Sequence, residues 1–145
     1  MTQTSIVNPD LLSHGTLECN DIAATRRFLS EFLGIDVVRP LPEAQYLSKG
    51  GPWTVVCVCV EGEQKVQGPQ NRFKLAVASA AEVDAAHAAA RAHKGAYGIR
   101  AIEGIDERNG VRSFRLQDMN NVWWEIGNLT QKYYDDAFAR GDVKA

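Results

Sequence analysis

The chain has 145 residues, of which 45% are hydrophobic and 23% are charged, a composition typical of one soluble globular domain or two small halves sharing a core. The formal net charge is only −2, with Lys and Arg scattered along the chain, which argues against nucleic acid or an anionic membrane surface as partner. Three cysteines, an odd number, favour a reducing cytoplasm, and the first residues predict neither a targeting signal nor a membrane segment.

The first half of the chain predicts a strand, a helix and further strands. Residues 12–19 (LSHGTLEC) are predicted as a strand, and Asn20 or Asp21 can cap the helix that follows. Apolar residues then recur at helical spacing up to Gly34, where a helix would end. Two more strands are predicted over residues 35–40 (IDVVRP) and 53–60 (WTVVCVCV).

The second half repeats this order after a polar linker. Residues 61–71 (EGEQKVQGPQN) contain no predicted element, and residues 72–79 (RFKLAVAS) predict a strand. Ser79 and Glu82 form a capping-box pattern at the start of an alanine-rich helix that reaches about Lys94. The remaining predicted elements are strands at 96–102, 111–118 and 122–128, turns at 107–110 and 119–121, and a short helix at 131–140.

The two halves therefore share one pattern, in which a strand and a helix are followed by two or three strands. We assign module one to about residues 10–60, the linker to 61–71, module two to about 72–128 and a C-terminal tail to 129–145. The halves share this pattern more than they share identical residues.

One carboxylate needs an explanation. Glu125 lies within the apolar run VWWEIG near the end of module two. A buried carboxylate without a partner costs several kcal/mol, so it normally has a cation, a metal or a set of donors beside it. The alternation of side chains along a strand places Trp123 on the face of Glu125 and Trp124 on the other.

Two motifs resemble those of the vicinal oxygen chelate superfamily, which includes glyoxalases, bleomycin-resistance proteins and extradiol dioxygenases. The first is HGTLECND at residues 14–21, followed by FLSEFLG at 28–34; the second is DMNNVWWE at residues 118–125. Asn121 stands for the usual glycine, which is tolerable because Asn accepts positive φ. The resemblance covers about residues 10–128 and implies an α+β fold, in which two βαβββ modules form an open, cup-shaped, mostly antiparallel sheet with helices outside.

The resemblance also implies a divalent metal, Fe²⁺, Mn²⁺ or Zn²⁺, with His14 and Glu125 as ligands. Arg72 occupies the position of the family's second histidine, and an arginine cannot ligate a metal. Cys57 stands where some members have a glutamate, although a thiol in such a run is more often core packing. Two alternatives therefore remain for Glu125. It is a ligand of a bound metal, or no metal is bound and an ion pair with Arg72 satisfies both charges.

Two functions follow from the resemblance. The first is a metal-dependent enzyme of the extradiol-dioxygenase, lyase or isomerase kind, which acts on a small molecule with vicinal oxygens. The second is a metal-free binding protein, similar to the drug-sequestering members, with Arg72 as anchor for an anionic or phenolic ligand and Trp123 as a wall. Core packing is the alternative role for Trp123, and no catalytic residue is assigned. The resemblance further implies a homodimer.

Overall fold

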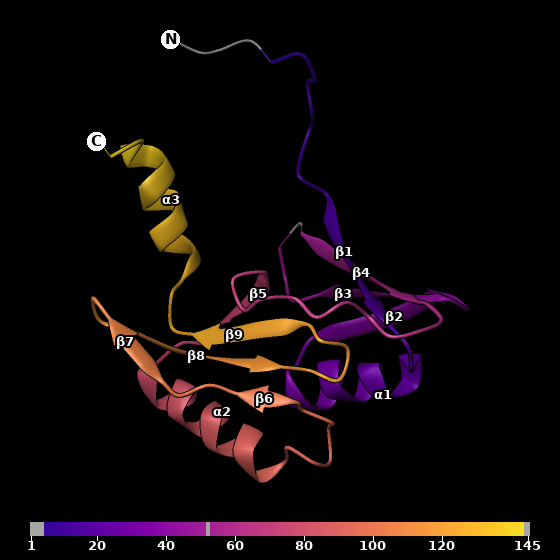
Figure 1. Ribbon diagram of the computed structural model, residues 1–145. Helices are drawn as coiled ribbons and strands as arrows, with labels where there is room; N and C mark the ends of the chain where they lie inside the picture. Colours follow the sequence, from indigo (N-terminus) through magenta and orange to yellow (C-terminus); the bar gives the residue numbers. More distant parts are fainter. Residues whose placement is uncertain (1–4, 52, 144–145) are drawn as a thin grey trace. The chain divides into compact units, whose positions relative to one another are not determined.

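The computed structural model describes residues 5–51 and 53–143 (Figure 1). The chain divides into two compact units, Met1–Gln64 and Lys65–Ala145. Each unit contains one sheet, and in each the order strand, helix, strands agrees with the predicted α+β class and the βαβββ pattern. The division falls inside the predicted linker.

Unit 1 is a four-stranded sheet with strand order β1-β4-β3-β2. Strand β1 is parallel to β4, whereas β3 pairs antiparallel with both β4 and β2. The elements are β1 (His14–Cys19), α1 (Ile22–Arg27), the π-helical segment η1 (Phe28–Phe32), β2 (Asp36–Leu41), β3 (Ala44–Ser48) and β4 (Thr54–Cys59).

The helical segment of unit 1 starts and ends where the sequence predicted. Asp21 is the N-cap, and its side chain accepts a hydrogen bond of 2.9 Å from the backbone N–H of Ala24. Phe28 and Leu29 are fully buried and form the apolar stripe of this segment. Gly34 has a φ of +69°, a left-handed conformation that glycine adopts without strain at a helix end.

Strand β3 (Ala44–Ser48) was missed by the sequence interpretation. The reason is Gln45, a polar residue that is fully buried and so breaks the apolar alternation by which a strand is recognised. Its amide nitrogen donates to the carbonyl of Ile22 in α1 at 3.3 Å. Gln45 therefore belongs to the side of the sheet that faces the helix.

Unit 2 has the same topology, with strand order β5-β9-β8-β6 and an additional strand, β7, paired with β8. Strand β5 is parallel to β9, and β8 is antiparallel to β9, β6 and β7. The elements are β5 (Arg72–Ala76), α2 (Ala80–Ala92), β6 (Ala101–Ile102), β7 (Asp106–Arg108), β8 (Val111–Gln117), β9 (Trp123–Gly127) and α3 (Gln131–Arg140).

Capping and turn residues explain where most helices and strands of unit 2 begin and end. The capping box is confirmed, because the hydroxyl of Ser79 accepts from Glu82 N and the Glu82 carboxylate accepts from Ser79 N. Asn109 and Gly110 both have positive φ in the β7–β8 turn, as an Asn-Gly hairpin requires. The predicted strand at 96–102 is wrong in its first part, because Gly98 turns the chain with φ +65° and only Ala101–Ile102 pair.

The core of unit 2 lies between its sheet and α2, which packs on β8 and β9 (Figure 1). Trp124, Phe114, Leu116 and Val83 are almost completely buried there. The ring of His87, on α2, meets Phe114 edge-on at 4.9 Å, so this histidine packs against the sheet. By contrast α3 has no buried residue.

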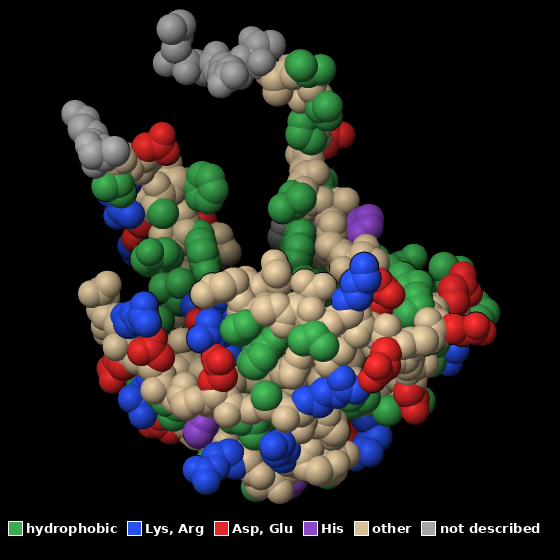
Figure 2. All heavy atoms as spheres, in the orientation of Figure 1, with side chains coloured by type: hydrophobic (Ala, Val, Ile, Leu, Met, Phe, Trp, Pro, Cys, Tyr) green, Lys and Arg blue, Asp and Glu red, His purple; other side chains and the backbone are tan. Residues whose placement is uncertain are grey.

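Basic and acidic side chains are interspersed on the surface seen in Figure 2. This distribution agrees with the scattered Lys and Arg of the sequence. Among the described residues, no helix combines the length and the apolar character needed to span a membrane.

Candidate functional site

Glu125 lies at the centre of a charged row that crosses the sheet of unit 2. The register pairs it with Lys74 on β5 and with Arg115 on β8, so the three side chains leave the same side of the sheet. Arg72 and Trp123 form the neighbouring row on that side. We call the side that carries these five residues the charged face. Trp124 points to the opposite side, as the alternation predicted, and is 2% exposed.

A tight turn places β9 so that Glu125 points to this face. Asp118 accepts hydrogen bonds from the backbone N–H groups of Asn120 at 2.8 Å and Val122 at 3.0 Å, and from the indole Nε1 of Trp124 at 3.0 Å. Burial raises the pKa of the Asp118 carboxyl, against the lowering effect of these donors. Asn121 has a φ of +64°, which confirms that it stands in the position of a turn glycine. The closing motif thus has a structural role.

Both oxygens of Glu125 are engaged by cations from β5. The Nε of Arg72 lies 2.5 Å from Oε1, and the Nζ of Lys74 lies 3.4 Å from Oε2. The Glu125 side chain is 9% exposed and that of Arg72 is 29% exposed. The predicted alternative of a Glu125–Arg72 ion pair is therefore present, with Lys74 as a second partner that the sequence interpretation missed.

The protonation of Glu125 follows from these neighbours. Burial acts to raise the pKa of its carboxyl, but the hydrogen bond from Arg72 and the charges of Lys74 and Arg72, together with a hydrogen bond from Ser113, outweigh burial. The pKa is lowered from its ordinary value of 4.5. Glu125 is consequently a carboxylate at neutral pH.

Gly127 leaves the space through which the Lys74 side chain reaches Glu125. A Cβ on Gly127 would lie 2.9 Å from the Cβ of Ser113, 3.2 Å from the carbonyl oxygen of Arg112 and 3.4 Å from Cε of Lys74. The lysine stem crosses β9 over this glycine, in space that a side chain would fill. Because Lys74 follows Arg72 by two positions, alternation places both on one side of β5. Only the register of β5 against β9 shows that Lys74 stands beside Glu125.

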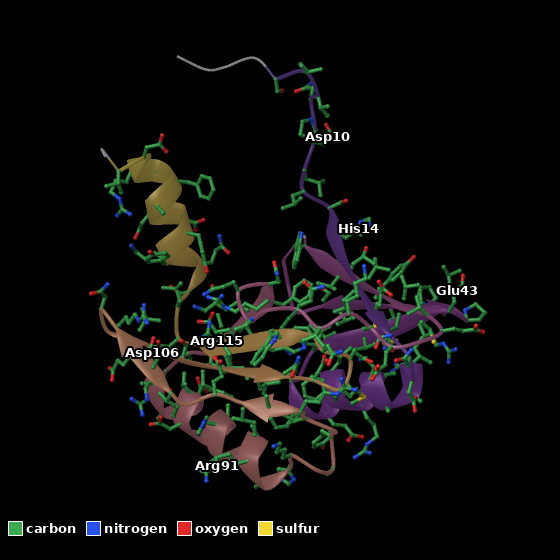
Figure 3. All side chains as sticks on the ribbon, viewed as in Figure 1. Asp10, His14, Glu43, Arg91, Asp106 and Arg115 are labelled. Atoms are coloured by element: carbon green, nitrogen blue, oxygen red, sulfur yellow. The ribbon has the colours of Figure 1, made fainter. Side chains whose placement is uncertain are left out.

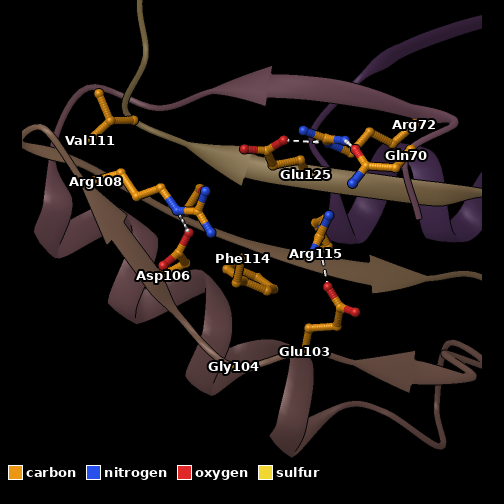
Figure 4. Close-up of a pocket in the computed structure, with 11 residues that line it drawn as sticks. Gln70, Arg72, Glu103, Gly104, Asp106, Arg108, Val111, Phe114, Arg115 and Glu125 are labelled. Carbon is orange, nitrogen blue, oxygen red and sulfur yellow. Dashed lines mark hydrogen bonds and ion pairs between the residues drawn. The ribbon is translucent and has the colours of Figure 1, made fainter.

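A pocket of about 350 Å³ opens beside Glu125 on unit 2 (Figure 4). Three ion pairs surround it: Arg72 with Glu125, Arg115 with Glu103 at 2.6 Å, and Arg108 with Asp106 at 2.8 Å. In the described part of the chain, Arg115 forms its hydrogen bond through Nε alone, so its terminal nitrogens remain available as donors.

Trp123 lies on the charged face but does not line this pocket. Its side chain is packed, with the residue 8% exposed, and its indole Nε1 donates to the carbonyl of Gln67 at 2.9 Å. The segment before β5 therefore covers the indole. A ligand-binding role for Trp123 stays a prediction.

His14 is the first residue of β1 and is exposed on unit 1 (Figure 3). Its Nδ1 lies 3.2 Å from the hydroxyl of Ser13. Arg72 holds the matching position in unit 2, as first residue of β5, in agreement with the motif alignment. Because His14 and Glu125 belong to different units, a site shared by these two residues stays a prediction.

The register of unit 1 corrects the position of Cys57. His14 pairs with Thr54 and Thr16 pairs with Val56, so Val56 is the residue equivalent to Glu125. Cys57 leaves the other side of the sheet, is 0% exposed, and receives a weak contact of 3.8 Å from the amide of Gln45. Core packing is thus its role, because a one-residue shift along a strand reverses the face.

A divalent metal does not fit the Glu125 site as its neighbours stand. Within the described residues there is no group of three or more His, Cys, Asp or Glu side chains arranged to hold a metal ion. A metal at Glu125 would face the positive charges of Arg72 and Lys74 and would have to displace them from the carboxylate.

Comparison with solved structures identifies the fold. The fosfomycin resistance protein FosX from Listeria monocytogenes matches with a TM-score of 0.65 and 20% identity, over 86% of this chain and 98% of the other. The oxidase ChaP-H2 matches with a TM-score of 0.64 and 19% identity, over 83% and 94%. Lactoylglutathione lyase from Agrobacterium tumefaciens matches with a TM-score of 0.57 and 19% identity, over 82% and 93%.

These structural neighbours are all members of the vicinal oxygen chelate superfamily. The fold of this chain is therefore the vicinal oxygen chelate fold, and the resemblance drawn from the two motifs is confirmed at the level of the fold. No protein-family profile matches the sequence. No curated protein matches it either.

Proposed function

We propose that this protein binds a small anionic or phenolic molecule on the charged face of unit 2, without a metal at Glu125. The observation that carries this proposal is the double engagement of Glu125, whose two oxygens are held by Arg72 and Lys74. A carboxylate neutralised in this way is a poor metal ligand. It instead holds two cations in place on the sheet.

The charge of the face supports an anionic ligand. On this face and around its pocket, three carboxylates stand against four cations: Glu103, Asp106 and Glu125 against Arg72, Lys74, Arg108 and Arg115. A guanidinium offers planar pairs of donors that match the oxygens of a carboxylate, a phosphonate or a phenolate. The terminal nitrogens of Arg115, which make no hydrogen bond to described residues, are such donors beside the pocket.

The size of the pocket limits the ligand. A volume of about 350 Å³ lies near the lower end of the range for small-molecule sites, which is roughly 300–1,000 Å³. One structural neighbour is a FosX variant described as complexed with Mn(II) and 1S,2S-dihydroxypropylphosphonic acid. That phosphonic acid belongs to the ligand class proposed here.

A metal-dependent enzyme of the dioxygenase, lyase or isomerase kind is the second candidate. The Mn(II) in that neighbour favours it, together with the motif positions of His14 and Glu125. If it holds, His14 and Glu125 would be the ligands, and the metal would supply a Lewis-acid centre for neighbouring substrate oxygens. Arg72 and Lys74 would then have to leave Glu125.

A titration separates the two functions. We would treat the protein with EDTA and measure binding of benzoate, phenylphosphonate and nitrophenolate by calorimetry, then repeat the measurement with Mn²⁺ or Fe²⁺. The proposal expects binding in EDTA that is unchanged by metal. Binding that requires the metal would overturn it in favour of the enzyme, and the absence of binding in every condition would exclude this pocket as an anion site.

Variants locate the anchor. Arg72→Met should weaken binding at least about tenfold, because a hydrogen bond to a charged group contributes about 1.5–3 kcal/mol. Arg115→Met tests the same pocket while leaving the Arg72–Glu125 pair intact, so it guards against loss of fold. Arg140→Met, on α3 and outside the pocket, is the matched control and should leave affinity unchanged.

We propose a homodimer as the assembly. Helix α3 exposes Tyr133, Tyr134 and Phe138, and a helix with an unburied aromatic side normally has a partner. A mass equal to one chain in light scattering at micromolar concentration would contradict this.

A further inference from the structure

Unit 1 contains three cysteines on one side of its sheet, and the proposed function uses none of them. Cys19 ends β1, and Cys57 and Cys59 lie two residues apart on β4. All three are present as thiols. The register pairs Cys19 directly with Cys59 across two parallel, neighbouring strands.

This pairing meets the requirement on the Cα separation for a disulfide. Neighbouring strands lie about 4.8 Å apart. Disulfides join Cα atoms separated by about 4.4–6.8 Å. Residues that are directly paired send their side chains to the same side of the sheet, and here the two sulfur groups are in hydrogen-bond contact. Cys19 is also in contact with Cys57, which is offset by two residues along β4.

Only one of the three thiols is accessible. Cys19 and Cys57 are 0% exposed, whereas Cys59 is half-buried. Cys59 lines a surface pocket together with Asn20 and Val60, and its thiol donates to the carbonyl of Asn20 at 3.2 Å. A small oxidant can therefore reach Cys59 from solvent, with Cys19 directly behind it.

The environment makes Cys19 the more acidic thiol of the pair. Hydrogen bonding from Cys57 is the largest influence on Cys19; with help from Thr25 and Cys59 it outweighs burial and lowers the pKa of Cys19 to about 7. Burial and the neighbouring charge of Cys19 raise the pKa of Cys59. Around neutral pH Cys19 is therefore partly in the thiolate form while Cys59 keeps its proton, and the thiolate is the reactive form of a cysteine.

We propose that Cys19 and Cys59 are an oxidation-sensitive dithiol, which closes to a disulfide between β1 and β4 on reaction with hydrogen peroxide. This site is independent of the charged face of unit 2. The crosslink would tie the first strand of unit 1 to its last and so restrict the unfolded chain.

The chemistry balances with peroxide as the oxidant. Cys59 passes its proton to the Cys19 thiolate and attacks one peroxide oxygen, so that the O–O bond breaks, hydroxide leaves and Cys59 becomes a sulfenic acid. The hydroxide removes the proton from Cys19 as water. The Cys19 thiolate then attacks the Cys59 sulfur, forming the S–S bond and expelling hydroxide, which takes a proton from solvent to become the second water. Two thiols are oxidised and one peroxide is reduced.

The test uses the full chain and counts thiols. After limited treatment with hydrogen peroxide, the protein is denatured and its remaining thiols are titrated with dithionitrobenzoate. The wild type should lose two of its three thiols. Its mass should fall by that of two hydrogen atoms, and non-reducing electrophoresis should show no linked chains. Reduction with dithiothreitol should restore all thiols.

Trypsin cleaves after Lys49 and Lys65, so Cys57 and Cys59 fall in one tryptic peptide. Peptide mapping of the wild type therefore does not distinguish which of them is linked to Cys19, and cysteine variants assign the disulfide. Cys57→Ser should lose both of its thiols and yield a linked peptide pair. Cys59→Ser should form no internal disulfide and should keep Cys19 reduced. The proposal is overturned if the wild type gains oxygen without crosslinking, if it stays reduced, or if Cys59→Ser links Cys19 to Cys57. The number of thiols that the wild type loses tests for the disulfide even if a variant fails to fold.

Discussion

The two units share one topology but differ in the chemistry of equivalent positions. In unit 2 the central row of the charged face is Lys74, Glu125 and Arg115. The equivalent row of unit 1, on β1, β4 and β3, is Thr16, Val56 and Tyr46. The same strand order and register therefore support a charged central row in one unit and an uncharged central row in the other.

On the opposite side of each sheet, which faces the helix, unit 2 is apolar and unit 1 carries the polar and reactive side chains. Unit 2 packs Leu75, Ile126 and Phe114 in one apolar row. The corresponding row of unit 1 is Leu17, Cys57 and Gln45, with the other two cysteines nearby. Backbone hydrogen bonding thus defines the scaffold, whereas single side chains decide which side carries chemistry.

Glu125→Gln should have the largest effect, because it removes the charge that balances Arg72 and Lys74. Losing one member of a fully buried pair costs about 3–5 kcal/mol, and the 29% exposure of the Arg72 side chain reduces our expectation to about 2–3 kcal/mol. Urea unfolding would measure the change. Glu18→Gln, at an exposed position of β1, is the matched control and should leave the free energy of unfolding nearly unchanged. A Glu125→Gln protein as stable as wild type would show that the pair has no net stabilising effect.

Gly127→Ala should cost about 2 kcal/mol through overpacking. The new Cβ would lie 2.9 Å from Ser113 Cβ and 3.2 Å from a backbone oxygen, which cannot easily move. The equivalent residue of unit 1 is Val58, so the comparison predicts that only unit 2 requires glycine here. Gly68→Ala, whose Cβ would meet nothing within 4 Å, is the control in a thermal melt. Equal melting of the two variants would contradict the close approach.

Acid should weaken unit 2 through Glu125. Its pKa in the folded protein is below the ordinary value of 4.5, so the native state binds fewer protons than the unfolded state. The stability that Glu125 contributes is complete above about pH 4.5 and is lost as pH falls through the folded pKa. The raised pKa of Asp118 acts in the opposite sense. The difference between wild type and Glu125→Gln isolates the first effect, and it should shrink with falling pH; a constant difference would refute this linkage.

Ser79→Ala should cost on the order of 1 kcal/mol, because it removes half of the capping box of α2. Ligand binding on the charged face should be unaffected. Thr130→Ala at the N-cap of α3 is a suitable control, since Thr130 makes no capping hydrogen bond. Guanidinium unfolding of the two variants would compare them, and the prediction fails if Thr130→Ala is the more costly change.

Gln45→Met should have the smallest effect and a stabilising sign. The Oε1 atom of Gln45 is buried and has no hydrogen-bond partner among the described residues, whereas unit 2 has Phe114 at this position. Removing an unsatisfied acceptor should offset the lost amide bond, giving between no change and about 1 kcal/mol of added stability. A loss above about 2 kcal/mol in a denaturant titration would show that the Gln45 amide is essential to the packing of α1.

The sequence alone predicted the repeat, the capping box, the positive φ of Asn121 and the fact that Trp123 and Glu125 share one side of the sheet. These features are local, since they depend on turn chemistry and on the alternation of side chains along one strand. It also offered Arg72 as a partner for Glu125, as one of two alternatives.

The tertiary structure decided what local patterns cannot. The register across strands brought Lys74 to Glu125, replaced Cys57 by Val56 as the equivalent of Glu125, and paired Cys19 with Cys59. Register depends on hydrogen bonding between segments far apart in the chain, and a shift of one residue reverses every side chain. The sequence therefore determined which residues are available for chemistry, and strand pairing determined which of them meet.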